Sequence, residues 1–180
     1  MTNRINREES GQAILELSFT FVILAVLAFG IVDFGRAIYD AAVMKNLSGE
    51  SSNLASRGSS AATAAQSVTT YASSSIDLKD QGCVIVTVVT NTTGTLQVTD
   101  QASQCAIPVT SKVGCLQGQS GCGSSNATLP SAASSALQSE VSGSSLYVTE
   151  IFYSYTASTP ITSFLQGSAL PSQLYSIAYY

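Results

Sequence analysis

The longest apolar stretch of the chain lies near its N-terminus. Residues 17–32 carry no charge, and extension back to Ala13 gives a segment interrupted by Glu16 alone. A helix of about twenty residues rises roughly 30 Å, close to the thickness of the hydrocarbon core of a bilayer. The pattern therefore predicts a single membrane-spanning helix over residues 13–32.

This helix is expected to continue beyond the apolar stretch. After Val32 the apolar residues recur mainly at intervals of three and four, the helical period. No proline occurs between Met1 and Pro108, so nothing forces a break at the membrane surface. We expect one helix over residues 12–57, ended by Gly58. The second half of this helix is expected to form a stalk.

Three further segments follow helical, strand and loop patterns. A helical period over residues 61–78 predicts a second helix that packs on the upper half of the first. Valine, isoleucine and threonine dominate residues 83–100, and turn residues at 91–94 divide them, which predicts a β-hairpin. Residues 116–128 are rich in glycine and serine, so a loop is predicted there.

The C-terminal part is expected to add a short helix and two strands. Residues 129–141 predict a helix that begins near Pro130. Alternation along 145–158 predicts a long strand with an aromatic face, and 173–180 predict an edge strand. The expected fold class is α+β, with a long N-terminal membrane-spanning and stalk helix packed against a small antiparallel sheet that has one exposed face.

Charge constrains the orientation and the class of partner. Arg4 and Arg7 precede the apolar stretch, and acidic residues count little in the positive-inside rule, so the N-terminus is expected in the cytoplasm and the body outside. The net charge is −4 with 10% charged residues, and no Lys/Arg cluster occurs. Nucleic acid is therefore not expected as a partner.

The residues that most catalytic sites require are scarce. The chain has no histidine, so neither a Ser/His nor a Cys/His pair can form. The glycines of residues 114–123 lack the Lys-Ser/Thr of a phosphate-binding loop. Sparse carboxylates, Glu150 among them, show no motif. We expect no enzymatic activity and no cofactor.

All four cysteines follow the apolar stretch: Cys83, Cys105, Cys115 and Cys122. An even number of cysteines after a membrane-insertion signal favours disulfides in an oxidising compartment over free thiols. Zinc is disfavoured because neither Cys-x-x-Cys nor histidine is present. Four cysteines allow three pairings, of which the local one, Cys83 with Cys105 and Cys115 with Cys122, is preferred.

A small residue precedes the apolar stretch, and no small-x-small site follows it, unlike an ordinary secretory signal. The sequence SGQAILEL resembles the cleavage site of type IV prepilin-like proteins, in which a hydrophilic leader ends in Gly and a Glu occupies the fifth mature position. The resemblance implies a leader over residues 1–11, cleavage between Gly11 and Gln12, and Glu16 as the assembly carboxylate. Filament-forming pilins usually carry Phe where this chain has Gln12.

The sequence FGIVDFGRAIYD resembles, more narrowly, the TadE-like pilus-assembly proteins, which follow a Gly-Ile-x-Asp/Glu-Phe-Gly-Arg-x-x-Tyr pattern where the helix leaves the membrane. The matching residues are Gly30, Ile31, Asp33, Phe34, Gly35, Arg36 and Tyr39. The resemblance implies an extracytoplasmic head domain over residues 58–180, held in the cytoplasmic membrane by the helix.

The function implied by this resemblance is that of a minor pilin or pseudopilin in a tight-adherence pilus. Its implied partners are a prepilin peptidase, other pilin subunits, an inner-membrane assembly platform and membrane lipid. A carboxylate in a bilayer is expensive, and the α-amino group that cleavage creates on a neighbouring subunit would pair with Glu16. Alternatively, Glu16 simply lies at the membrane interface. Two other functions stay open, a major filament subunit and a membrane-anchored binding domain with a tyrosine-rich face.

Overall fold

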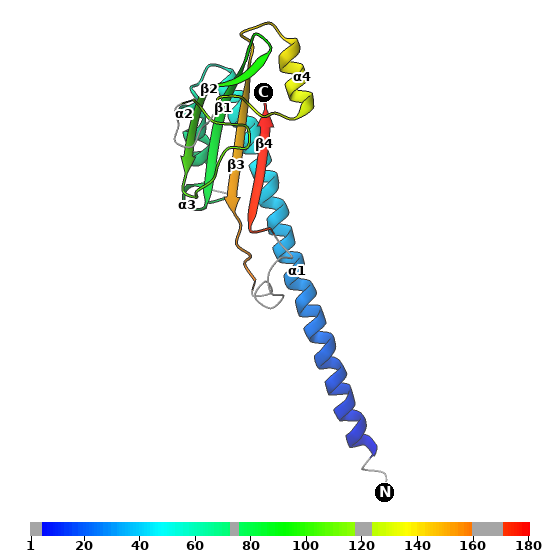
Figure 1. The fold of residues 1–180 in the computed structure, drawn as a ribbon. Coiled ribbons are helices and arrows are strands. Elements are labelled where there is room, and N and C mark those ends of the chain that lie inside the picture. Colours follow the sequence, from blue (N-terminus) through cyan, green and yellow to red (C-terminus); the bar gives the residue numbers. More distant parts are fainter. Residues whose placement is uncertain (1–4, 73–75, 118–123, 160–170) are drawn as a thin grey trace. The chain divides into compact units, whose positions relative to one another are not determined.

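A computed structural model describes residues 5–72, 76–117, 124–159 and 171–180, with the backbone alone for residues 5–10. The helices and strands are α1 (Ile5–Ser56), α2 (Ala61–Ala72), α3 (Leu78–Gln81), β1 (Gly82–Thr92), β2 (Thr95–Cys105), α4 (Ser131–Ser139), β3 (Ser145–Ser154) and β4 (Gln173–Tyr179). The fold is α+β, as predicted: a long N-terminal apolar helix is followed by a small antiparallel sheet (Figure 1).

The chain forms two compact units. One combines α1 up to Ile38 with the segment that begins at Thr156. The other comprises Tyr39–Tyr155 and Pro171–Tyr180. Helix α1 contributes to both units, because its residues before and after Ile38 contact different segments of the chain.

The start of α1 differs from the prediction. The expected start at Gln12 is wrong, because the helix begins at Ile5. Residues 5–11 contain no proline, and their arginine and glutamates are good helix formers, so nothing stops the helix before the apolar stretch. Within that stretch, the hydroxyls of Ser18 and Thr20 donate to carbonyls four residues earlier, at 2.8 and 2.9 Å, and so find partners inside the helix.

The end of α1 is set by a glycine, as predicted. Gly58 has φ +97°, a left-handed conformation that glycine adopts without a steric penalty. Its N–H donates to the carbonyl of Ala55 at 3.1 Å, and the N–H of Ser59 donates to the carbonyl of Leu54 at 3.4 Å. This pair of hydrogen bonds satisfies the last helical carbonyls and stops the helix in a Schellman motif.

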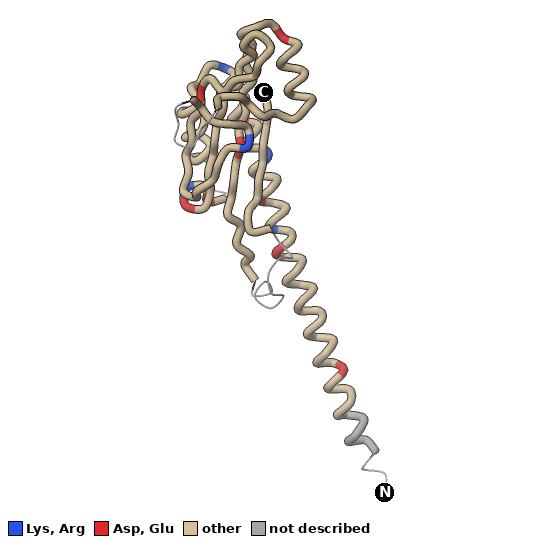
Figure 2. Tube along the Cα trace, in the orientation of Figure 1, with Lys and Arg blue, Asp and Glu red and all other residues tan. Residues whose placement is uncertain are grey.

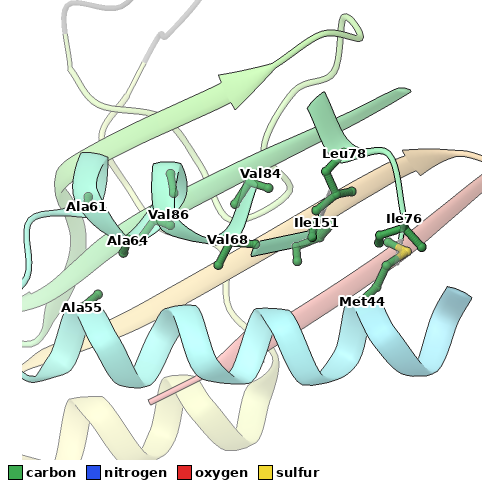
Figure 3. Close-up of a cluster of buried hydrophobic side chains, with 12 residues drawn as sticks. Met44, Ala55, Ala61, Ala64, Val68, Ile76, Leu78, Val84, Val86 and Ile151 are labelled. Carbon is green, nitrogen blue, oxygen red and sulfur yellow. The ribbon is translucent and has the colours of Figure 1, made fainter. Parts of the chain in front are cut away.

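The main core lies between the last turns of α1, helix α2 and one face of the sheet (Figure 3). Its buried side chains include Met44, Ala55, Ala64, Val68, Val84, Val86 and Ile151. Two α1 serines bind β4: Ser52 Oγ donates to the Ala178 carbonyl at 3.2 Å, and the hydroxyls of Ser48 and Ser176 lie 3.1 Å apart. Small side chains therefore let this end of α1 approach the sheet closely.

Helix α2 is shorter than predicted. The expected helix over 61–78 ends at Ala72, and a separate short helix, α3, begins at Leu78. Asp77 caps α3 by accepting a hydrogen bond from the Asp80 N–H at 3.1 Å. An aspartate favours such a cap over a helix interior, which explains why the helical pattern is divided there.

The sheet has the order β2-β1-β3-β4, and its pairings are antiparallel. The predicted hairpin is confirmed: Thr92 pairs with Thr95 across a two-residue turn. Both turn residues have positive φ, 51° at Thr93 and 87° at Gly94. Such turns match the right-handed twist of the flanking strands. The predicted edge strand is also confirmed, as β4.

The prediction of an exposed sheet face is wrong, because both faces are covered. The second face carries two further clusters, formed by Val89, Leu96, Val113, Leu137 and Val148 and by Cys83, Ile85 and Phe152 with Ile107, Val109 and Tyr175 around them. Side chains from the segment after β2 and from α4 contribute to this cover. The described residues between β2 and α4 have little regular structure, so no periodic pattern in the sequence predicted that they cover the sheet.

Helix α4 confirms the predicted short helix, although it is shorter at both ends and Pro130 is its N-cap instead of its first helical residue. Asn91, buried at the end of β1, donates from Nδ2 to the carbonyls of Leu137 and Glu140 at 3.0 and 3.1 Å. This amide therefore ties the end of α4 to the sheet. Residues 118–123 of the predicted glycine-rich loop lie outside the described residues.

Candidate functional site

The predicted cleavage site and assembly carboxylate lie on one exposed stretch of α1. Gly11, Gln12 and Glu16 are all exposed. Beyond Glu16 the helix carries no charge until Asp33 (Figure 2). The large apolar side chains between them are exposed as well, for example Leu17 at 69% and Phe19 at 71%. This surface is unsatisfied in water and requires a membrane or a neighbouring helix.

The same stretch meets the length and hydropathy requirements of a membrane span. Among the described residues one helix does so, within Gly11–Ser56, and its most apolar window has a mean hydropathy of 2.4 with no residue buried. An apolar helix that is exposed all round differs from the buried core helix of a soluble protein. The finding fits a single-pass membrane protein.

Asp33, at the end of the apolar stretch, is the centre of a set of hydrogen bonds that also involves Arg36, Ser158 and Thr159. We call this set the clasp. Its carboxylate is only 1% exposed. Oδ1 accepts hydrogen bonds from the backbone N–H groups of Ser158 and Thr159, at 3.1 and 3.2 Å, and Oδ2 accepts one from the Thr159 hydroxyl. One turn further along, the Arg36 guanidinium donates to the hydroxyl of Ser158.

This clasp gives two motif residues a physical role inside the chain. Burial of a carboxylate is tolerated when several donors satisfy it, and hydrogen bonds to an ionised group are the strong ones. Asp33 and Arg36, three residues apart, suggest a helix-surface pair from the sequence alone. Asp33 instead binds Ser158 and Thr159, and Arg36 binds the Ser158 hydroxyl, which fastens the connection after β3 to α1. Sequence spacing could not show this contact, because it joins segments more than a hundred residues apart.

The other motif residues leave α1 open to a partner. Outside the helix backbone, no atom of the described residues lies within 4 Å of a Cβ placed at Gly30 or Gly35. Phe34 and Tyr39 are 49% and 58% exposed. The glycines therefore clear no space for the described part of this chain.

Cys83 and Cys105 stand opposite each other in the register of β1 and β2 and are joined by a disulfide. This is the local pairing preferred from the sequence. Cys115 is also disulfide-bonded. Its preferred partner, Cys122, lies outside the described residues, so that pair stays a prediction.

A buried carboxylate with several hydrogen-bond donors lies on the second sheet face and was not predicted from the sequence. Glu150, in the middle of β3, is 0% exposed. It accepts hydrogen bonds from the Lys112 N–H and the Tyr175 hydroxyl, both at 2.9 Å, and from the Ser111 hydroxyl. The Lys112 ammonium lies 3.6 Å from the centroid of the Tyr175 ring. Glu150 thus fastens the segment after β2 across the sheet.

Removing this carboxylate is expected to destabilise the domain. In Glu150→Ala, three donors lose their acceptor, and each buried unsatisfied group costs about 1–3 kcal/mol, so we expect the free energy of unfolding to fall by about 2–4 kcal/mol. Denaturant unfolding of the full chain in detergent measures this. Glu140→Ala, at an exposed position, is the control, with an expected change within about 0.5 kcal/mol. Equal, small effects of both substitutions would contradict the role of Glu150.

Two tyrosines of β4 lie in the field of this carboxylate. Burial, and next to it the negative charge of Glu150, raise the pKa of Tyr175. The same two causes raise the pKa of Tyr179. Both effects favour the neutral phenol in the folded state.

Stability should therefore decline in alkali. A raised folded-state pKa contributes stability that is complete below the unfolded-state tyrosine pKa of about 10 and is lost as the pH rises above it. Tyr175→Phe is expected to lower stability at neutral pH, because it removes a donor to Glu150, and to make the decline above about pH 10 shallower. Chemical unfolding at a series of pH values tests both parts. An unchanged alkaline slope would contradict the assignment.

The tyrosines of β3, and Tyr155 just after it, do not form an open binding face. Tyr147 and Tyr153 are partly buried against the main core, and Tyr155 is 8% exposed. The aromatic face predicted from the sequence therefore exists, but it packs inward. This weakens the reasoning that suggested a ligand-binding domain.

With this geometry described, comparison with known proteins adds one finding. Residues 11–52 match the family model described as TadE-like protein. The matched range contains the exposed apolar helix, Glu16 and the Asp33–Arg36 half of the clasp, and it confirms the resemblance inferred from the sequence. The match suggests involvement in assembly of a Tad pilus. No curated protein and no solved structure matches the chain.

Proposed function

We propose that this chain is a minor pilin, or pseudopilin, of a tight-adherence pilus. It is made with a leader over residues 1–11, cleaved after Gly11 by a prepilin peptidase, and held in the cytoplasmic membrane by the apolar part of α1. The head domain then lies outside the cytoplasm. The observation that carries the proposal is the position of Glu16, five residues after Gly11, at the head of an exposed apolar helix within the TadE-like match.

The proposed mechanism assigns a task to each part of this helix. The apolar surface anchors the subunit in the bilayer and later packs against helices of other subunits. Burial of the unpaired Glu16 carboxylate in hydrocarbon costs at least a few kcal/mol, so this side chain favours positions where it can pair with a cation. The α-amino group of a processed neighbour is such a cation. The pair therefore favours insertion of a subunit into an assembly over its stay in the lipid.

Substitution of the carboxylate tests this mechanism. Glu16→Ala is expected to leave membrane insertion intact, because the helix becomes more apolar, and to reduce the incorporation of this chain into pili by about tenfold or more. Sheared pili and membranes are probed separately for the chain. Glu50→Ala, an exposed carboxylate on α1 outside the apolar stretch, is the control and should assemble normally. Normal incorporation of Glu16→Ala would refute the mechanism.

Peptide counting on purified filaments separates a minor from a major subunit. A minor pilin should be far below the abundance of the principal filament protein, and cells lacking this chain should make fewer pili. If this chain supplies most of the filament mass, it is the major subunit instead.

A further inference from the structure

Cleavage after Gly11 would give the mature chain an unusual first residue. The new N-terminus would be Gln12, which is exposed on α1. While Gln12 is joined to Gly11, its backbone nitrogen belongs to a peptide bond and cannot act as a nucleophile. Proteolysis converts that nitrogen into a primary amine that lies close to the amide carbonyl of the same side chain.

Resting on the proposed processing, we infer that Gln12 is a modification site, at which the new N-terminus closes into pyroglutamate. The unprotonated α-amine attacks the side-chain Cδ, forming an N–Cδ bond. The Cδ–Nε2 bond breaks, and ammonia leaves with a proton from the attacking nitrogen. Nothing is oxidised or reduced, and no co-reactant is required. The product is a cyclic lactam with one N–H and no charge.

The surroundings of Gln12 favour the uncharged product. The structure has Gln12 within α1, and cleavage would make it the first residue of the remaining helix. The N-terminus of a helix carries a partial positive charge, so a terminal ammonium there would be repelled by the helix dipole. The exposed apolar surface begins with Ile14 and Leu15, so a terminal charge next to it would also resist entry into hydrocarbon. Cyclisation removes both penalties. Glu16, one turn later, is an anion near the same helix end and needs no cation from its own chain.

The modification would leave this chain with the carboxylate of the amine–carboxylate pair but without the amine. Its Glu16 could still receive the amine of a neighbour, but its own N-terminus would offer no amine in return. Two copies of this chain could not then be joined by the amine–carboxylate pair. Its neighbour at Glu16 would be a different subunit with a free N-terminus, which suits a minor component better than a homopolymer.

Mass spectrometry of the full chain from membranes and pili tests the inference. A chain that begins at Gln12 and is lighter by one ammonia, about 17 Da, than the free-amine form supports it. A synthetic peptide of residues 12–19 with heavy isotopes and a free N-terminal glutamine, added at lysis, corrects for cyclisation during handling. Gln12→Ala is the matched control and should yield a free amine, open to Edman degradation.

The outcomes separate the inference from the function on which it rests. A chain that begins at Gln12 with a free or methylated amine overturns the inference and leaves the processing in place. Retention of residues 1–11 overturns the processing and the inference together. Cyclisation of the heavy peptide to the same extent as the native N-terminus shows a handling artefact and also overturns the inference.

Discussion

Gly11→Leu is expected to leave residues 1–11 attached to the chain and to keep it out of pili. A peptidase that cleaves after glycine must fit the residue before the scissile bond, and a leucine side chain adds bulk where glycine has none. Without cleavage no α-amine forms at Gln12, and a hydrophilic leader stays joined to the helix. We expect processing to fall by about 100-fold or more, a loss of recognition worth about 3 kcal/mol. Immunoblotting of whole cells and sheared pili measures both effects.

The matched control is Gly49→Leu, on the same helix but far from the leader. No described atom beyond the helix backbone lies within 4 Å of a Cβ placed there. Its leader should be removed at the normal rate. Efficient processing of Gly11→Leu, or a processing defect in Gly49→Leu of the same size, would disagree with cleavage at residue 11.

Asp33→Ala is expected to release the connection after β3 from α1. The substitution leaves the N–H groups of Ser158 and Thr159 and one hydroxyl without their acceptor. Losses of this kind cost about 1–3 kcal/mol for each buried group, and partial exposure here lowers the total to about 3 kcal/mol. Hydrogen exchange at Ser158 and Thr159 should accelerate by about 100-fold in detergent-solubilised full chain.

Two further variants give the effect a graded scale. Asp33→Asn keeps one acceptor oxygen and should show an intermediate acceleration, whereas Arg36→Ala removes only the bond to the Ser158 hydroxyl and should show a small one. Exchange in β3 serves as an internal reference that should not change. If all three variants exchange like the unsubstituted chain, the clasp does not hold this segment.

Much of the fold follows from local patterns in the sequence. The apolar stretch and the helical spacing after it predict α1, and Gly58 predicts its end, because these signals depend on neighbouring residues. The hairpin is equally local, since β-branched residues flank a turn that needs positive φ at Thr93 and Gly94. Cys83 and Cys105 then meet because the hairpin register places them opposite each other.

The features that the sequence did not predict depend on distant contacts. Glu150 has the alternation expected of a surface residue on an amphipathic strand, yet the segment after β2 covers it, and no periodicity marks that segment. Asp33 has a plausible partner three residues away in Arg36, yet its donors lie beyond β3. In both cases the sequence around the carboxylate is the same whether its hydrogen-bond donors are water molecules or distant residues of the chain. Only the fold distinguishes these two situations.

The central claim is that a prepilin peptidase creates the working form of this protein. The most direct measurement is the intact mass of the chain recovered from piliated cells, compared with that from otherwise identical cells without the peptidase. The account predicts a chain that begins at Gln12 in the first case and one that retains residues 1–11 in the second. A pilus-associated chain that still carries residues 1–11 in peptidase-positive cells would contradict it.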